Sequence, residues 1–83
     1  MNKVLLELFL PASGKFFDVR IPRQISVYQA TQMIICMLEE MNTGEYMPDM
    51  AAVMCDAKTG EQYDINVSID SLKLCNGTKI MLV

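Results

Sequence analysis

The sequence predicts a single α+β domain in which one amphipathic helix packs on one face of a mixed β-sheet. Three observations predict this class. Two segments with strand-like alternation open the chain, one segment with helical periodicity follows, and the segments after the helix are again short and strand-like. The 83 residues fit one domain, residues 1–83, and 52% of them are hydrophobic, which supports a packed core.

The first two strands are predicted over residues 3–10 and 15–21. The even-numbered residues of the first segment are apolar from Val4 to Leu10, so they share one face of the strand. In the second segment the odd-numbered residues from Phe17 onward are apolar in the same way. Residues 11–14 contain Pro and Gly and predict a short turn, so the two strands form a hairpin.

A helix is predicted over residues 26–42. Ser26 is a good N-cap, and Gln29 stands three residues later, which is the capping-box spacing. The sequence Asn42-Thr43-Gly44 supplies a stop signal. At about 100° per residue one stripe of the helix is apolar. It contains Val27, Ala30, Ile34, Met37, Leu38 and Met41.

The chain after the helix contains shorter elements. We expect a loop over 45–50, followed by strands over 51–55 and 61–65 that are joined by a turn at 56–60. A helical turn capped by Ser68 is expected over 68–72. An Asn76-Gly77 turn then leads to a last strand over 78–83. The order is β-β-α-β-β-β, and the first and last strands are expected to pair in parallel at the centre of the sheet. This is the β-grasp architecture. Its expected core is Val4, Leu6, Val19, Ile21, Val27, Ile34, Leu72, Ile80 and Leu82.

Composition argues against several classes of function. The net charge is −3 and the seven basic residues are scattered, whereas nucleic-acid binding needs clustered Lys and Arg. The chain has no histidine, which removes the commonest general base and metal ligand. The three cysteines, Cys36, Cys55 and Cys75, are too far apart for a zinc or iron–sulfur site. We expect reduced and mostly buried thiols, with Cys36 the most exposed, no cofactor, no metal and no catalytic residues.

The order and spacing of the elements resemble ubiquitin along nearly the whole chain. Two segments, Phe17-Asp18-Val19-Arg20-Ile21-Pro22 and Ser71-Leu72-Lys73-Leu74-Cys75-Asn76-Gly77-Thr78-Lys79-Ile80, resemble the YukD/EsaB family. That family comprises small bacterial ubiquitin-like proteins associated with the type VII (WXG100/Esx) secretion system. The resemblance implies a cytoplasmic, non-enzymatic accessory protein, which lies peripherally at a membrane secretion complex. A related domain forms the N-terminus of a membrane component of the mycobacterial machines.

The C-terminal residues bear on conjugation chemistry. Sulfur carriers with this fold need a flexible Gly-Gly end that reaches an adenylating enzyme, whereas this sequence ends in Ile80-Met81-Leu82-Val83 and contains no Gly-Gly. We therefore expect neither adenylation nor covalent attachment to other proteins if this is the mature end. The sequence also has no run of about 20 apolar residues, so we expect no membrane span.

A second apolar face is predicted on the sheet. If Val4 and Leu6 face the helix, then apolar residues at the alternate positions face away from it. We expect a protein-interaction surface there, bordered by Glu7, Asp18 and Arg20, that binds secretion proteins or a second copy of the chain. It contains Leu5, Phe9, Phe16, Met81 and Val83, with Val53 or Met54 depending on register. The alternative is scattered surface hydrophobic residues that loops partly cover.

The sequence is compatible with two functional classes. The first is an interaction module of a type VII secretion locus, and the second is a β-grasp accessory subunit or regulator of an unrelated enzyme complex. Neighbouring genes for WXG100 proteins and an FtsK/SpoIIIE-type ATPase would favour the first.

Overall fold

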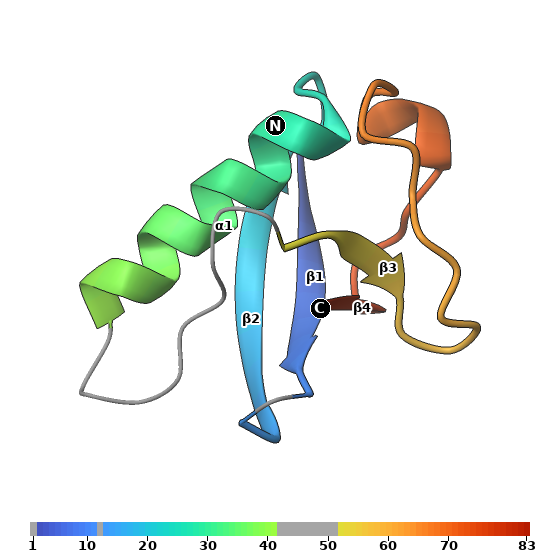
Figure 1. Cartoon of the computed structure of the whole chain (residues 1–83). Coiled ribbons are helices and arrows are strands. Elements are labelled where there is room, and N and C mark those ends of the chain that lie inside the picture. Colours follow the sequence, from blue (N-terminus) through green and yellow to red (C-terminus); the bar gives the residue numbers. More distant parts are fainter. Residues whose placement is uncertain (1, 12, 42–51) are drawn as a thin grey trace.

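The fold is a four-stranded mixed sheet with one helix on one face (Figure 1). The computed structural model describes residues 2–11, 13–41 and 52–83. The strand order is β2-β1-β4-β3, so that β1 and β4 lie at the centre, as predicted. The elements are β1 (Lys3–Leu10), β2 (Lys15–Pro22), α1 (Val27–Met41), β3 (Met54–Asp56), the 3₁₀-helix η1 (Asp70–Leu72) and β4 (Thr78–Leu82). The α+β class and the β-grasp arrangement are confirmed.

The hairpin of β1 and β2 follows the predicted alternation. The strands are antiparallel, with Val4 opposite Ile21 and Leu6 opposite Val19, and all four of these side chains are buried against α1. The turn between the strands contains Gly14 at a φ of 73°, a left-handed conformation that glycine adopts without a steric penalty. The hairpin therefore presents one apolar face to the helix.

The turn before β4 is hydrogen-bonded to β1, the neighbouring central strand. The N–H of Thr78 donates to the carbonyl of Cys75 at 3.0 Å, and Gly77 has a φ of 89°. The side-chain oxygen of Asn76 accepts the N–H of Leu5 at 2.9 Å, while the N–H of Gly77 donates to the carbonyl of Leu5 at 2.8 Å. The Asn76 amide thus extends the β1–β4 ladder by one acceptor, and parallel pairing continues from Leu6 opposite Thr78.

The first turn of α1 is held by the predicted capping box and by a distant loop. The Ser26 hydroxyl accepts the N–H of Gln29 at 3.1 Å, and the Gln29 side-chain oxygen accepts the N–H of Ser26 at 3.1 Å. The N–H of Val27 donates to Val67 at 2.8 Å and that of Tyr28 to Ile65 at 3.0 Å. These donors lack partners within the helix, so the loop satisfies them.

Replacing Ser26 with alanine should therefore destabilise the protein by about 0.5–2 kcal/mol, because the N–H of Gln29 loses its acceptor. Urea unfolding monitored by circular dichroism measures this difference. Ser26→Thr keeps the hydroxyl and is the matched control, for which we expect a smaller loss. Equal stability of Ser26→Ala and the wild type would contradict the assigned cap.

The core contains nearly all residues predicted for it. Val4, Leu6, Val19, Ile21, Val27, Ile34, Ile80 and Leu82 are buried. Leu72 is the exception and is only half-buried, because the buried position in this segment is taken by Ile69, at the start of η1. On α1, Thr31 and Ile35 are also buried, whereas Met37 is half-buried. The side chain of Met41, the predicted stop at 42–44 and the predicted loop at 45–50 lie outside the described residues.

The predicted strand over 61–65 is wrong. That segment makes one isolated bridge, between Gln62 and Cys55. A tight turn precedes it, in which the Asp56 carboxylate accepts the N–H of Lys58 at 2.7 Å. The chain then leaves the sheet because the carbonyls of Ile65 and Val67 bond to the N-terminus of α1. The predicted helical turn is present as η1, where the Ser68 hydroxyl accepts the N–H of Ser71 at 3.1 Å.

The bounds of the third and last strands also differ from the prediction. The third strand begins at Met54 and not at residue 51, which lies outside the described residues, and the last strand ends at Leu82. Val53 and Val83 still exchange two backbone hydrogen bonds, of 2.9 and 3.1 Å, directly beyond the ends of β3 and β4.

Candidate protein-interaction surface

The outer face is the face of the sheet that points away from α1. Phe16 lies opposite Phe9 on the antiparallel pair β2–β1, and Phe9 lies opposite Met81 on the parallel pair β1–β4. These three residues form what we call the apolar row. The rings of Phe9 and Phe16 are stacked, with centroids 4.7 Å apart and an interplanar angle of 29°. Phe16 is 60% exposed, while Phe9 and Met81 are half-buried.

Two valines extend the apolar row along β3 and β4. Val53 and Val83 are paired through their backbones, and Val83 is 56% exposed. Met54 is buried and 1% exposed, so the register selects Val53 as the outward residue of the two alternatives. Cys55 lies opposite Met81 at the end of the row and is buried. With Cys55 and Val53, the apolar residues of the outer face therefore extend from β2 at one edge of the sheet to β3 at the other.

A second row, which we call the charged row, lies next to the apolar row. It contains Asp18, Glu7 and Lys79, since Glu7 is opposite Asp18 on β2 and opposite Lys79 on β4. The Lys79 Nζ lies 3.6 Å from Glu7 Oε2. An exposed ion pair of this kind contributes little to stability, but it can orient a partner and discriminate between partners.

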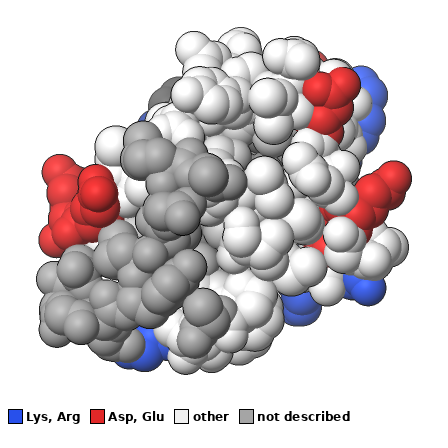
Figure 2. Space-filling view, viewed as in Figure 1, with Lys and Arg blue, Asp and Glu red and all other residues white. Residues whose placement is uncertain are grey.

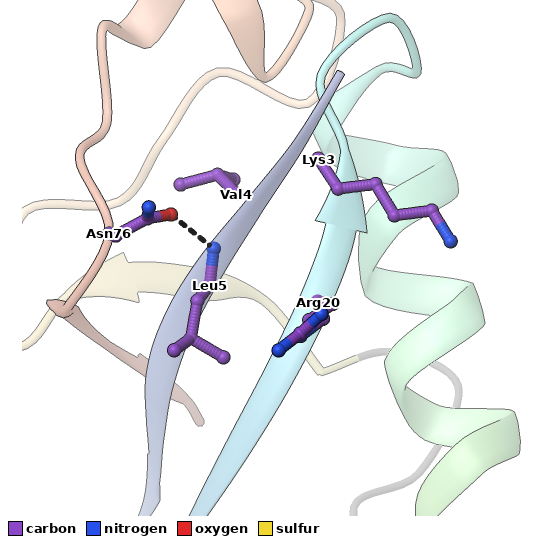
Figure 3. A pocket seen from close by; sticks show the side chains of 5 residues that line it. All are labelled: Lys3, Val4, Leu5, Arg20 and Asn76. Carbon is purple, nitrogen blue, oxygen red and sulfur yellow. Dashed lines mark hydrogen bonds between the residues drawn. The ribbon is translucent and has the colours of Figure 1, made fainter. Parts of the chain in front are cut away.

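Leu5 is separated from the rest of the predicted surface. The charged row lies between it and Phe9, and its cross-strand neighbour is Arg20. Figure 3 shows Leu5 and Arg20 on neighbouring strands, with the Asn76 side chain bonded to the Leu5 N–H. A pocket lies at this place, and it is lined by Lys3, Val4, Leu5, Arg20 and Asn76. The predicted patch is thus divided into the apolar row with Val83 and an isolated Leu5. Of the predicted polar neighbours, Glu7 and Asp18 lie between these two parts, whereas Arg20 lies beside Leu5.

Two features of the surface are not predicted by the sequence. Lys79 joins the charged row through the parallel register, which no local sequence signal specifies. Tyr28 and Ile65 are 55% and 42% exposed, and the backbone hydrogen bond between them brings two exposed apolar residues together at the start of α1. Because the sequence pattern predicts a strand over 61–65, it does not predict this contact.

The cysteines only partly match the prediction. Cys36 is exposed, as expected from its position opposite the apolar stripe, but Cys75 is exposed as well, so the expectation of mostly buried thiols is wrong. Cys75 lies in the turn before β4, where its N–H donates to the Thr78 hydroxyl at 3.0 Å. Burial raises the pKa of the Cys55 thiol. Among the described residues, no three His, Cys, Asp or Glu side chains are grouped as metal ligands would be.

Charged side chains are dispersed on the face seen in Figure 2. Lys and Arg atoms appear there as separate groups near the margin, and the described residues in the middle of this face are uncharged. This distribution differs from the continuous basic stripe of a nucleic-acid-binding face. In the described part of the chain, the single long helix, α1, has 15 residues and is too short to cross a bilayer.

Tyr63 is bonded to β3 through its backbone N–H, which donates to the carbonyl of Met54 at 3.1 Å. Its hydroxyl is buried and has no hydrogen-bond partner among the described residues. Burial raises the pKa of Tyr63 to about 12, and the Asp56 carboxylate adds to this rise through its charge and its closeness to the hydroxyl, although the two groups fall short of hydrogen-bond geometry. A raised pKa means that the neutral hydroxyl is favoured in the folded state. The stabilisation is complete below the ordinary pKa of 10 and is lost as the pH rises through 10 toward 12.

Tyr63→Phe should therefore flatten the decline of stability between pH 10 and 12. At neutral pH the variant should be as stable as the wild type or more so, because it removes a buried hydroxyl that has no partner. Urea midpoints at pH 7, 9 and about 10.5 measure both effects. An unchanged alkaline decline in Tyr63→Phe would contradict this assignment.

Comparison with known proteins identifies the fold. No protein-family model and no curated protein sequence matches this chain. Among solved structures, the ubiquitin-like domain of the Mycobacterium tuberculosis type VII secretion protein ECCD1 matches with a TM-score of 0.77 at 12% identity, over 100% of this chain and 99% of that domain. The sheet and helix are therefore those of a ubiquitin-like β-grasp domain.

Two further structures share the fold in larger assemblies. A chain of the MycP5-free ESX-5 inner membrane complex matches with a TM-score of 0.75 at 14% identity, over 100% of this chain but only 21% of its own length. A chain of a toluene 4 monooxygenase HD complex matches with a TM-score of 0.77 at 11% identity, over 98% of this chain and 96% of its own. Structural neighbours of this chain thus include ubiquitin-like domains of type VII secretion proteins.

Proposed function

We propose that this ubiquitin-like chain is a non-enzymatic protein-interaction module and an accessory component of a bacterial type VII secretion system, of the YukD/EsaB kind. The observation that carries the proposal is the apolar row of Phe16, Phe9 and Met81 on the outer face, which is exposed chiefly at Phe16 and lies beside a row of charges of both signs. The likeness to ECCD1 and to the ESX-5 chain supports the secretion context. We expect the protein to act in the cytoplasm, peripherally at the membrane complex, without a cofactor or metal.

The partner would contact both rows of the outer face. An apolar side chain or strand of the partner would pack on the stacked rings of Phe9 and Phe16, where aromatic surface gives the largest gain on burial. Glu7 and Lys79 would then orient the partner along the strands, because the pairing of β1 with β4 holds these two charged side chains in fixed positions. Binding of this kind needs no catalytic group.

An affinity experiment tests the proposal. The tagged chain is expressed in its native host, cross-linked and purified, and the retained proteins are identified by mass spectrometry. We expect type VII components, such as WXG100 proteins or the FtsK/SpoIIIE-type ATPase, to be enriched over a matched bait that carries Phe9→Asp. Equal recovery with both baits, or recovery without secretion components, would refute the proposal.

A second candidate function is an accessory subunit or regulator of an unrelated enzyme complex. The match to a chain of the toluene 4 monooxygenase complex favours it, because that chain and this one cover each other almost completely. In that case the wild-type bait would retain subunits of an oxidoreductase or another enzyme, and deletion of the gene would change that activity and leave secretion intact.

A further inference from the structure

Strand β2 forms one edge of the sheet, and no strand of the described residues pairs with the backbone groups on its outer side. The N–H of Arg23 donates to the carbonyl of Asn2 at 2.7 Å, and these residues continue the register that places Lys3 opposite Pro22. Hydrogen-bonded pairs alternate along an antiparallel ladder. The odd-numbered residues of β2 therefore bond to β1, whereas Phe16, Asp18 and Arg20 point their N–H and C=O groups away from the sheet.

The side chains at this edge carry a specific pattern. Phe16, Asp18 and Arg20 are all exposed on the outer face, with opposite charges two residues apart. Among the described residues, neither the Asp18 carboxylate nor the Arg20 guanidinium takes part in a hydrogen bond or ion pair that would occupy it. Pro22 ends the strand and has no N–H to donate. The edge thus offers a short ladder with one acidic and one basic position.

We propose that two copies of the chain associate through antiparallel pairing of their β2 strands around a two-fold axis at Val19. In this register Asp18 of each copy lies directly opposite Arg20 of the other, and Phe16 lies opposite Pro22. Each Asp18–Arg20 pair adds two backbone hydrogen bonds, and each Phe16–Pro22 pair adds one. On the helix side, Phe17, which is half-buried in the single copy, gains cover from Ile21 of the second copy.

Charge selects this register over its neighbours. If one copy slides along the other by two residues in one direction, Asp18 lies opposite Asp18 of the second copy. If it slides by two residues in the other direction, Arg20 lies opposite Arg20. Like charges directly opposite each other on one face destabilise an antiparallel pair, whereas opposite charges stabilise it. Charged residues usually protect a sheet edge from pairing. Here the alternation of sign permits one symmetric pairing and opposes the adjacent ones.

The dimer does not cover the outer face, and it places the outer faces of the two copies side by side. Both copies would contribute to one continuous sheet, with Phe9 and Met81 of each copy on the same side of it and not covered by the second copy. A partner that binds the apolar row could then contact two rows at once, and the second contact would be strengthened by the first. This inference does not depend on the partner or on the proposed function, because it concerns the purified chain alone.

Sedimentation equilibrium of the purified chain, from micromolar to millimolar concentration, tests the proposal by charge reversal. The interface is small, so we expect a weak, concentration-dependent dimer. Asp18→Arg and Arg20→Asp should each weaken it by roughly tenfold or more, because each places like charges opposite each other twice. The double variant Asp18→Arg/Arg20→Asp should restore dimerisation to within about threefold of the wild type, since opposite charges face each other again.

A cross-linking experiment tests the register. Cys36 and Cys75 are exposed and are first replaced by serine. Directly opposite residues in a hydrogen-bonded pair have Cα atoms about 5.5 Å apart, which a disulfide can span. Asp18→Cys mixed with Arg20→Cys should form a disulfide-linked dimer on oxidation, whereas either variant alone should not. A monomer at all concentrations, no response to charge reversal, or equal cross-linking by Asp18→Cys alone would each overturn the proposal.

Discussion

Replacing Ile34 with alanine should destabilise the protein by roughly 2–5 kcal/mol. Ile34 is 0% exposed at the centre of α1 and belongs to the cluster that joins the helix to the sheet. The substitution removes buried methyl and methylene groups and leaves a cavity that a tightly packed core fills only in part. In a small domain of marginal stability this loss is a large fraction of the total. Urea unfolding monitored by circular dichroism measures it.

Two variants serve as controls for this measurement. Ile34→Val removes one methylene and should cost about 0.5–1.5 kcal/mol, which gives a graded response if the site is packed. Cys36→Ala lies on the exposed side of the same helix and should change stability by less than about 0.5 kcal/mol. A loss below about 0.5 kcal/mol for Ile34→Ala would place the residue outside the core.

Phe9→Asp, alone or with Phe16→Asp, should abolish association with a secretion partner and leave the fold intact. Phe9 is the central residue of the apolar row, stacked on Phe16 and opposite Met81, and its side chain lies on the face away from the core. A carboxylate there would have to be desolvated on binding, which opposes docking of an apolar group. Circular dichroism reports folding, and a pull-down reports association.

The exposed side of α1 supplies the matched control. Glu39 is exposed on the helix, so Glu39→Lys changes charge without touching the outer face and should retain the partner. Phe16→Asp alone is the variant least able to disturb packing, since Phe16 is 60% exposed. Unchanged association of both phenylalanine variants, with loss in Glu39→Lys, would move the binding surface to the helix around Gln29, Gln32 and Glu39.

The features that the sequence predicted correctly are those with local signals. The capping box at Ser26 and the alternation from Val4 to Leu10 depend on residues within a few positions, so their periods and spacings can be read directly. The proposed strand over 61–65 has the right composition but a competing role. Its carbonyl at Ile65 bonds to Tyr28, a residue far away in sequence. Tertiary hydrogen bonding thus overrode local preference.

The arrangement of the candidate surface could be predicted only in part for the same reason. Alternation placed Phe9 and Phe16 on one face, because strand period is a local property. The position of Lys79 opposite Glu7, and hence the isolation of Leu5, depends on how β4 is aligned along β1. That register is set by the Asn76 turn and its bond to Leu5, which involves residues 71 positions apart.

The pairing of β1 with β4 also has consequences for how the chain folds. Residues so far apart meet only after a large loss of chain entropy, which favours early formation of the β1–β2 hairpin and of α1 from local contacts. Until β4 docks, the unpaired side of β1 is an open strand edge beside an apolar face, a state prone to aggregate. Variants that weaken the Asn76–Gly77 turn should therefore slow the last folding step and lower the yield of refolding at high concentration.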